Sequence, residues 1–133
     1  MKSLTVSSNL SEIDKVRAFL KINFKDIDIS DEDYYVIELS LLEICINIIR
    51  YAYPLEDGNI SLKIWRQERQ IHLEIRDKGL AFDPRESKTP DLENIMNSGR
   101  KGGLGIFLTR KLMDGIEYRR EGGQNILTLT KKY

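Results

Sequence analysis

The stretch that decides the fold is IELSLLEICINIIRYAY, residues Ile37–Tyr53. Its apolar residues surround most of the circumference of a helix instead of forming one stripe, so the sequence predicts a largely buried helix. Two polar residues interrupt it. Glu43 and Asn47, four positions apart, lie one above the other on one face of the helix, and Arg50 continues that face.

A buried carboxylate and a buried amide each need a partner, because leaving them unsatisfied costs several kcal/mol. A metal ion that carries a phosphate would satisfy Glu43 and Asn47 together. Taken alone, the segment favours a simpler interpretation, in which the two are satisfied core groups or part of a solvated stripe. The remaining motifs of the chain reverse this preference.

Composition limits the classes of protein. The chain has 133 residues, enough for one domain, residues 1–133, with a single core. Lys plus Arg and Asp plus Glu both number 21, so no overall field favours a nucleic acid or a membrane surface as partner. Cys45 is the only cysteine, which excludes an internal disulfide and suits a reducing compartment. The sequence shows neither a signal-peptide pattern nor an apolar span of about 18 residues, so we expect a cytoplasmic protein.

The residues before the buried helix predict a strand and a second helix. Lys2–Ser7 alternates between apolar and polar residues, as a strand does, and a helical stripe then runs to about Phe24. Ser30 followed by Asp33 resembles a capping box, so the buried helix is expected to begin just after Ser30.

The second half of the chain predicts four strands and one more helix. Alternation predicts strands at Asn59–Gln67, Gln70–Asp77, Ile116–Arg120 and Asn125–Lys131, and Gly115 is expected to cap the helix before the third of these. Helices gathered with such strands indicate an α/β (α+β) fold. We expect a two-layer sandwich, with a mostly antiparallel mixed sheet covered on one face by about three helices.

Two further segments carry possible chemistry. Asp77-Lys78-Gly79 ends a predicted strand and by itself reads as a turn. Residues 84–102 lack periodicity, which is unusual in a compact domain and typical of a lid or a binding loop, with a short helix possible at Leu92–Met96.

The loop ends in a glycine-rich run, Gly99–Gly105, which leads into an apolar-periodic helix. Such a turn presents free backbone N–H groups and the positive end of a helix dipole to an anion, and Arg100 and Lys101 add charge there. A flexible loop closed by a glycine cap is the alternative. The run matches neither the phosphate-binding loop of P-loop proteins nor the dinucleotide fingerprint, and the protein-kinase signatures are missing.

The three motifs in this order resemble the GHKL superfamily of ATP-binding domains, and within it the compact anti-sigma-factor serine protein kinases. The similarity covers nearly the whole chain. Glu43 to Tyr53 is similar to the family's E-x-x-x-N-x-x-x-H-A-Y, with Tyr51 in place of the histidine. Asp77 to Pro84 is similar to D-x-G-x-x-F-D-P, with Ala81 where many members have a second glycine. Gly103 to Ile106 resembles the G-L-G-I start of the family's last helix.

The resemblance implies a role for each motif. Asp77 would accept the amino hydrogen of adenine, Gly79 would let the backbone and a water approach the base, and Asn125 would reach the nucleotide from the last strand. Asn47 would ligate Mg²⁺ through its side-chain oxygen. Glu43 would orient and deprotonate the attacking hydroxyl. The phosphates would be held by the basic residues and the helix start that follow the lid: Arg100, Lys101, Gly103, Leu104 and Gly105.

The function implied by the resemblance is that of a serine protein kinase of a partner-switching module, with ATP and Mg²⁺ as cofactors. Such a kinase phosphorylates a serine on a STAS-type anti-anti-sigma protein and sequesters a sigma factor or an analogous regulator, and its relatives work as homodimers. A nucleotide-binding adaptor without phosphotransfer is the alternative, and a small-molecule-binding domain without nucleotide is a third hypothesis. Glu43 favours the enzyme, since an adaptor needs no buried base.

Overall fold

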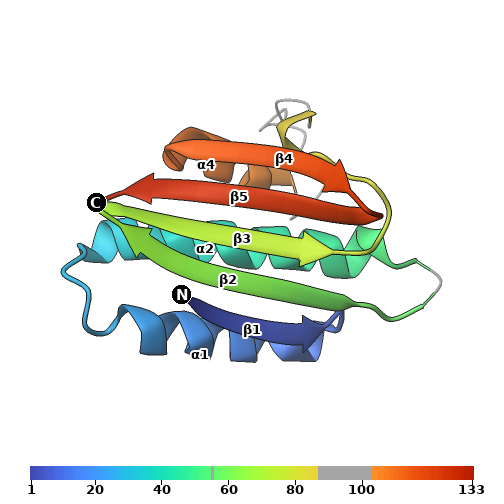
Figure 1. Cartoon of the computed structure of the whole chain (residues 1–133), viewed down its shortest axis with the longest axis horizontal. Helices are drawn as coiled ribbons and strands as arrows, with labels where there is room; N and C mark the ends of the chain where they lie inside the picture. Colours follow the sequence, from blue (N-terminus) through green and yellow to red (C-terminus); the bar gives the residue numbers. More distant parts are fainter. Residues whose placement is uncertain (55, 87–102) are drawn as a thin grey trace, which may run out of the picture.

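The computed structural model describes residues 1–54, 56–86 and 103–133. Five strands form one sheet, and helices α1, α2 and α4 lie behind it in the view of Figure 1. This arrangement confirms the predicted two-layer α/β fold. The elements in chain order are β1 (Lys2–Ser7), η1 (Leu10–Glu12), α1 (Ile13–Phe24), α2 (Asp31–Asn47), η2 (Ile48–Ala52), β2 (Asn59–Gln67), β3 (Gln70–Asp77), η3 (Pro84–Glu86), α4 (Gly103–Leu112), β4 (Gly115–Glu121) and β5 (Gln124–Lys132).

The order of strands in the sheet is β1-β2-β3-β5-β4, and every pair of neighbours described is antiparallel. The last strand is therefore inserted beside β3. Its register places Asn125 directly opposite Asp77, and β4 in turn places Arg120 opposite Asn125. The topology thus lines up three polar residues, far apart in sequence, across one end of the sheet.

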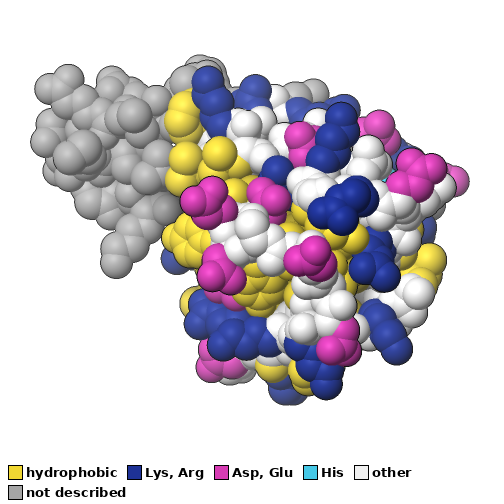
Figure 2. Space-filling view, turned by 90° about the vertical axis from the view of Figure 1, so that its left-hand side faces the viewer, with side chains coloured by type: hydrophobic (Ala, Val, Ile, Leu, Met, Phe, Trp, Pro, Cys, Tyr) yellow, Lys and Arg dark blue, Asp and Glu magenta, His cyan; other side chains and the backbone are white. Residues whose placement is uncertain are grey.

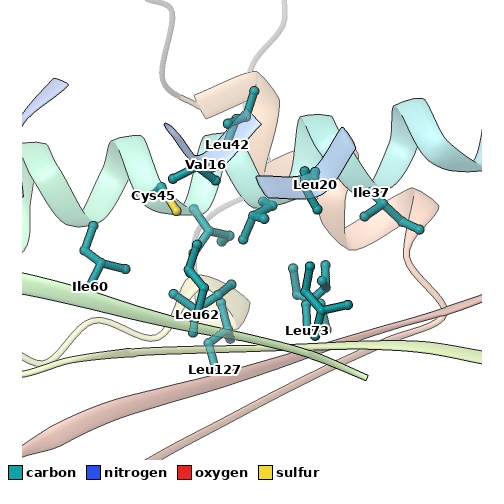
Figure 3. Close-up of a cluster of buried hydrophobic side chains, with 14 of the residues drawn as sticks. Val16, Leu20, Ile37, Leu42, Cys45, Ile60, Leu62, Leu73 and Leu127 are labelled. Atoms are coloured by element: carbon teal, nitrogen blue, oxygen red, sulfur yellow. The ribbon is translucent and has the colours of Figure 1, made fainter. Parts of the chain in front are cut away.

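The hydrophobic core lies between the helices and the sheet. Alternate residues of β2 and β3 are buried against the helix layer, as the period of two requires. Figure 3 shows side chains of α1 and α2, among them Leu20 and Ile37, pointing toward Leu62 and Leu73 of the sheet. Cys45 is fully buried in this cluster, and burial raises the pKa of its thiol to about 12, so it acts as a packing residue.

Helix α2 begins at a side-chain cap and ends in a wider turn. The Ser30 side chain accepts a hydrogen bond from the backbone N–H of Asp33 (3.1 Å), which confirms the predicted cap. Beyond Asn47 the helix widens into a π-helical turn, η2, that the sequence did not predict. A π turn shifts the side chains that follow it, and such turns are frequent at functional sites.

Two glycines make the turn between β4 and β5. Gly122 and Gly123 have φ angles of 59° and 76°, which suit a tight hairpin between β4 and β5. The predicted helix cap at Gly115 is wrong. Helix α4 ends at Leu112, and the backbone N–H of Asp114 already bonds to the carbonyl of Thr130 (2.9 Å), so strand pairing takes over before Gly115 is reached.

Positively and negatively charged side chains are mixed on the surface. On the face shown in Figure 2, Lys and Arg side chains alternate with Asp and Glu side chains, in keeping with the equal numbers in the sequence. Among the described helices, none combines the length and the apolar character that crossing a bilayer requires. The predicted lid enters the described residues only as η3; residues 87–102, including the possible helix at Leu92–Met96, lie outside them.

Candidate functional site

A pocket opens between the end of α2 and the sheet, at the C-terminal end of β3. Three of the predicted site residues, Asn47, Asp77 and Asn125, line it. Its remaining walls are apolar or aromatic, as expected of a site that receives a flat base. These walls are formed by Ile44, Ile48, Tyr51, Ala52, Ile75, Leu80, Phe82, Pro84, Tyr118 and Leu127.

Asp77 is the polar centre of this pocket. Its side chain is buried at the end of β3, with 5% of the residue exposed. The Oδ1 atom accepts hydrogen bonds from the backbone N–H of Gly79 (2.9 Å) and from Nδ2 of Asn125 (3.0 Å). The Oδ2 atom accepts none from the residues that the structure describes. One carboxylate oxygen is therefore held by the protein, and the other is available to a donor on a ligand.

Asn125 supports Asp77 from the neighbouring strand. Its Nδ2 atom also donates to the carbonyl of Leu80 (2.8 Å), while its Oδ1 atom accepts from the hydroxyl of Tyr118 and from Nη1 of Arg120 (3.0 Å). The amide is thus engaged at both ends within the protein. Tyr118 and Arg120 were missed in the sequence because only the pairing of β4 with β5 brings them to Asn125.

Gly79 has a packing reason to be glycine. A Cβ atom built there would lie 2.4 Å from both the Cβ and the carbonyl oxygen of Ala52. The next residue, Leu80, donates its backbone N–H to that same carbonyl (2.8 Å). The turn after β3 therefore packs directly on the backbone of η2, an approach that a side chain at position 79 would prevent.

Tyr53 joins the end of the buried helix to the same turn. Its hydroxyl donates to the carbonyl of Asn59 (2.9 Å) and accepts from the backbone N–H of Lys78 (2.7 Å). A Cβ atom built at Gly58 would lie 2.0 Å from the Tyr53 ring, so the ring packs directly on this glycine. Tyr51, by contrast, is 57% exposed and stands at the rim of the pocket.

Asn47 meets the requirement for a ligand-binding amide. It is 6% exposed, it lines the pocket, and its side chain forms no hydrogen bond with any described residue. An amide oxygen that has no partner within the protein and faces a pocket suits a hard cation. No group of three or more His, Cys, Asp or Glu side chains that could hold a metal occurs among the described residues. A divalent ion here would therefore depend on Asn47 and on oxygens from a phosphate.

Glu43 lies one helical turn before Asn47 and faces α4. A Cβ built at Gly105 would lie 2.1 Å from Cδ and 2.2 Å from Oε2 of Glu43, so the first turn of α4 packs directly on the carboxyl group. Glu43 itself is half-buried and does not line the pocket around Asp77. It stands instead between the two predicted motifs, the E-x-x-x-N helix and the glycine-rich helix start.

Burial raises the pKa of Glu43 above its ordinary value, and the positive charge of Arg50 works against this rise. A carboxylate that holds its proton more tightly is a stronger base when it is ionised. The position and the raised pKa together suit a group that takes a proton from a hydroxyl.

The structure thus brings Asn47, Asp77 and Asn125 to one pocket, and Gly79 lies in the turn beside Asp77. Glu43 and Gly105 are in contact with each other one helical turn before Asn47. Gly103 and Leu104 form the start of α4, where the first N–H groups of a helix lack internal partners. The other two predicted phosphate-binding residues, Arg100 and Lys101, lie outside the described residues.

The fold and the pocket agree with a known family of nucleotide-binding domains. The sequence family described as the histidine kinase-like ATPase domain matches residues 6–131. The chain therefore belongs to that family, and membership in a family of ATPase domains implies the use of ATP. The predicted family resemblance is confirmed.

Two curated relatives narrow the comparison. The chain is 35% identical over 85 residues to the serine/threonine-protein kinase BtrW of Bordetella bronchiseptica, which covers 63% of this chain and 60% of that protein. It is 33% identical over 104 residues to the serine-protein kinase RsbW of Halalkalibacterium halodurans, covering 75% of this chain and 63% of that protein. The matched region thus spans less than two thirds of either relative.

Solved structures support the fold. The chain is similar to a Mycobacterium tuberculosis protein with RsbU and RsbW domains, with a TM-score of 0.65 and 14% identity over 99% of this chain and 32% of that one. The Acinetobacter baumannii histidine kinase AdeS gives a TM-score of 0.51 and 15% identity over 99% of this chain and 68% of that one. At these identities the similarity concerns the fold alone.

Proposed function

We propose that this chain is an ATP-dependent serine protein kinase and anti-sigma factor that acts in the cytoplasm. Its substrate would be a serine on a STAS-type anti-anti-sigma protein, and its other partner a sigma factor or an analogous regulator. The names of the two relatives described above, a serine/threonine-protein kinase and a serine-protein kinase, support the reaction. The motif resemblance supports the two partners and the homodimer that we propose with them.

The contact between Glu43 and Gly105 carries the proposal. Transfer of a phosphoryl group to a serine needs a group that orients the hydroxyl and takes its proton, close to the site that holds the phosphates. Glu43 has a raised pKa and packs on the first turn of α4, whose N–H groups are suited to phosphate oxygens. When bound, Mg²⁺ and ATP would supply the phosphoryl group and neutralise its charge.

The remaining residues would hold the nucleotide. Asp77 would accept the adenine amino hydrogen at its free Oδ2 atom, and Asn47 would provide the protein ligand to Mg²⁺. Gly103, Leu104 and Gly105 would present backbone N–H groups to the phosphates. Arg100 and Lys101 are proposed to add positive charge there.

A binding adaptor without phosphotransfer is the second candidate. One observation favours it: Glu43 does not line the pocket that contains Asn47 and Asp77. In an adaptor this carboxyl group would serve only to pack α2 against α4.

Incubation with labelled ATP and a candidate STAS-type protein separates the two functions. We expect phosphoserine on the partner, and at least a hundredfold loss of transfer in Glu43→Gln with ATP binding retained, since general-base catalysis contributes about 10²–10⁴-fold. Glu38→Gln, a change of the same kind on the same helix, is the control and should keep full activity.

ATP binding without phosphoserine would favour the adaptor. Transfer that survives in Glu43→Gln would exclude Glu43 as the base. Asp77→Asn should weaken ATP binding itself, and unchanged affinity in that variant would contradict the proposed contact with adenine.

A further inference from the structure

We propose that Arg120 is a positioning residue that fixes the orientation of the Asn125 amide, and so decides which oxygen of Asp77 meets the ligand. In this way it gives the pocket part of its preference for a base that donates a hydrogen bond. The proposal rests on the nucleotide-binding function proposed above, and it concerns a residue outside the three motifs.

The strand register brings the three residues into one row. Arg120 pairs with Asn125 across β4 and β5, and Asn125 pairs with Asp77 across β5 and β3. From the edge strand, Nη1 of Arg120 donates to Oδ1 of Asn125 (3.0 Å) and to the carbonyl of Gly79 (3.0 Å). One guanidinium thus contacts both the support of Asp77 and the turn that follows it.

The donors around Asn125 leave its amide one favourable orientation. Tyr118 and Arg120 both donate to its carbonyl oxygen, so the NH₂ group must face Asp77 and the carbonyl of Leu80. A flipped amide would direct its NH₂ group at a guanidinium and its oxygen at a carboxylate, and both contacts are repulsive. A guanidinium carries N–H donors and no acceptor, so Arg120 acts here as a donor only.

The orientation of the Asn125 amide determines which oxygen of Asp77 is available to a ligand. With the Asn125 NH₂ group and the Gly79 N–H both on Oδ1, the Oδ2 atom is the one that a ligand can reach. An ionised carboxylate only accepts, so it favours the amino group of adenine and opposes the oxygen that inosine carries at the same position. If the amide could rotate, Asn125 could offer its own NH₂ group to that oxygen, and the discrimination would fall.

The exposure of Arg120 separates this role from a purely structural one. The residue is exposed on the edge strand and belongs to no part of the buried core, so its removal should leave the fold intact. Its neighbour Arg119 is equally an exposed arginine of β4, but it pairs with Glu121 and not with the Asn125 row. Arg119→Met is therefore a control that removes the same charge one residue away.

The test compares the dissociation constants of ATP and inosine triphosphate by calorimetry, with Mg²⁺ present. Wild type and Arg119→Met should show the same preference for ATP. In Arg120→Met we expect that preference to fall about fivefold, the factor that follows from losing the hydrogen bond that holds the Asn125 amide. Tyr118→Phe, which removes the other donor to the Asn125 oxygen, should lower it in the same direction.

The outcomes separate this proposal from the function on which it rests. A wild type that prefers ATP, with the preference unchanged in Arg120→Met, overturns the role of Arg120 and leaves the nucleotide site standing. A wild type that binds both nucleotides equally overturns the adenine contact and this proposal with it. In the free protein, the side-chain amide NMR signals of Asn125 should lose their protection from exchange in Arg120→Met and keep it in Arg119→Met; the reverse contradicts the proposal.

Discussion

At Glu43 the needs of stability and of chemistry oppose each other. The carboxyl group is half-buried under the first turn of α4, where its charge is poorly solvated. A residue kept for packing alone would be better replaced by an uncharged side chain of the same size. The retention of an ionisable group at a cost in stability is typical of functional sites.

Replacing Glu43 by Gln should therefore stabilise the protein at neutral and alkaline pH. Because the pKa of the folded protein's Glu43 lies above the ordinary 4.5, the folded state binds this proton more tightly than the unfolded chain does. Stability consequently falls as the pH rises through the folded pKa, and it is unaffected below the unfolded pKa, where both states are protonated.

Urea unfolding of wild type and Glu43→Gln measures this difference. The variant should have the larger free energy of unfolding at about pH 8, and the two proteins should converge at about pH 3, below both pKa values. Equal stabilities at both pH values would mean that Glu43 is ionised in the folded state without penalty.

At the scale of elements, sequence patterns predicted the strands and helices because each buries one face. The bounds of β2 and β3 agree with the predicted strands residue for residue, since apolar and polar residues alternate within each strand. The π turn after Asn47 was not predicted. A π turn adds a single residue to the helix, and this does not visibly change the spacing of apolar residues in so short an apolar run.

Spacing could predict the candidate site only where its residues are local in sequence, and Asn125 was expected from the family resemblance alone. Glu43 with Asn47, and Asp77 with Gly79, each lie within one helix or one turn, so spacing alone could link them. Arg120 joins Asp77 through Asn125, which requires knowing that β5 lies between β3 and β4. That order depends on tertiary packing, and no local pattern encodes it.

The junction between η2 and the turn after β3 yields a prediction for Gly79. A methyl group added there meets the Ala52 carbonyl at 2.4 Å, and this atom belongs to the backbone and cannot turn away. We expect Gly79→Ala to lower the free energy of unfolding by about 1–3 kcal/mol, the usual range for overpacking. The same junction holds the pocket, so nucleotide affinity should fall as well.

Gly115→Ala provides the matched control for this change. Its added Cβ would lie 3.4 Å from Cβ of Thr130, an ordinary contact. Chemical denaturation of both variants should show a clear loss for position 79 and a small change for position 115. Similar losses at the two positions would contradict the role assigned to the contact with Ala52.

At the scale of the whole molecule, the described helices cover one face of the sheet (Figure 1). The pocket lies where that helix layer meets the end of β3. The opposite face carries side chains such as Trp65 and His72, whose rings stack with centroids 5.2 Å apart. Asn47 and Asp77 lie at the border of the core, where the Asn47 amide and the Oδ2 atom of Asp77 have no hydrogen-bond partner among the described residues. A ligand that completes these two groups should stabilise the entire fold.

Thermal unfolding with nucleotide tests this coupling. A ligand at a hundred times its dissociation constant adds about 2.7 kcal/mol when it binds only the folded state. With an unfolding entropy of about 2.1 cal/mol/K per residue, that corresponds to a rise in Tm of roughly 10 °C for a chain of this size. We expect this rise with Mg²⁺ and ATP together, and a smaller one with ATP in the presence of a chelator, because Asn47 then lacks the cation that it would bind.

Two variants test which residues are responsible for the rise in Tm with ATP and Mg²⁺. Asn47→Ala should unfold at the same temperature with ATP whether or not Mg²⁺ is present, since the difference between the two conditions depends on its side-chain oxygen. Asp77→Asn should lose most of the rise in both conditions, because it replaces the acceptor at Oδ2. If Asn47→Ala kept the full Mg²⁺-dependent rise, the cation would be held by other groups, and the buried amide would need a different explanation.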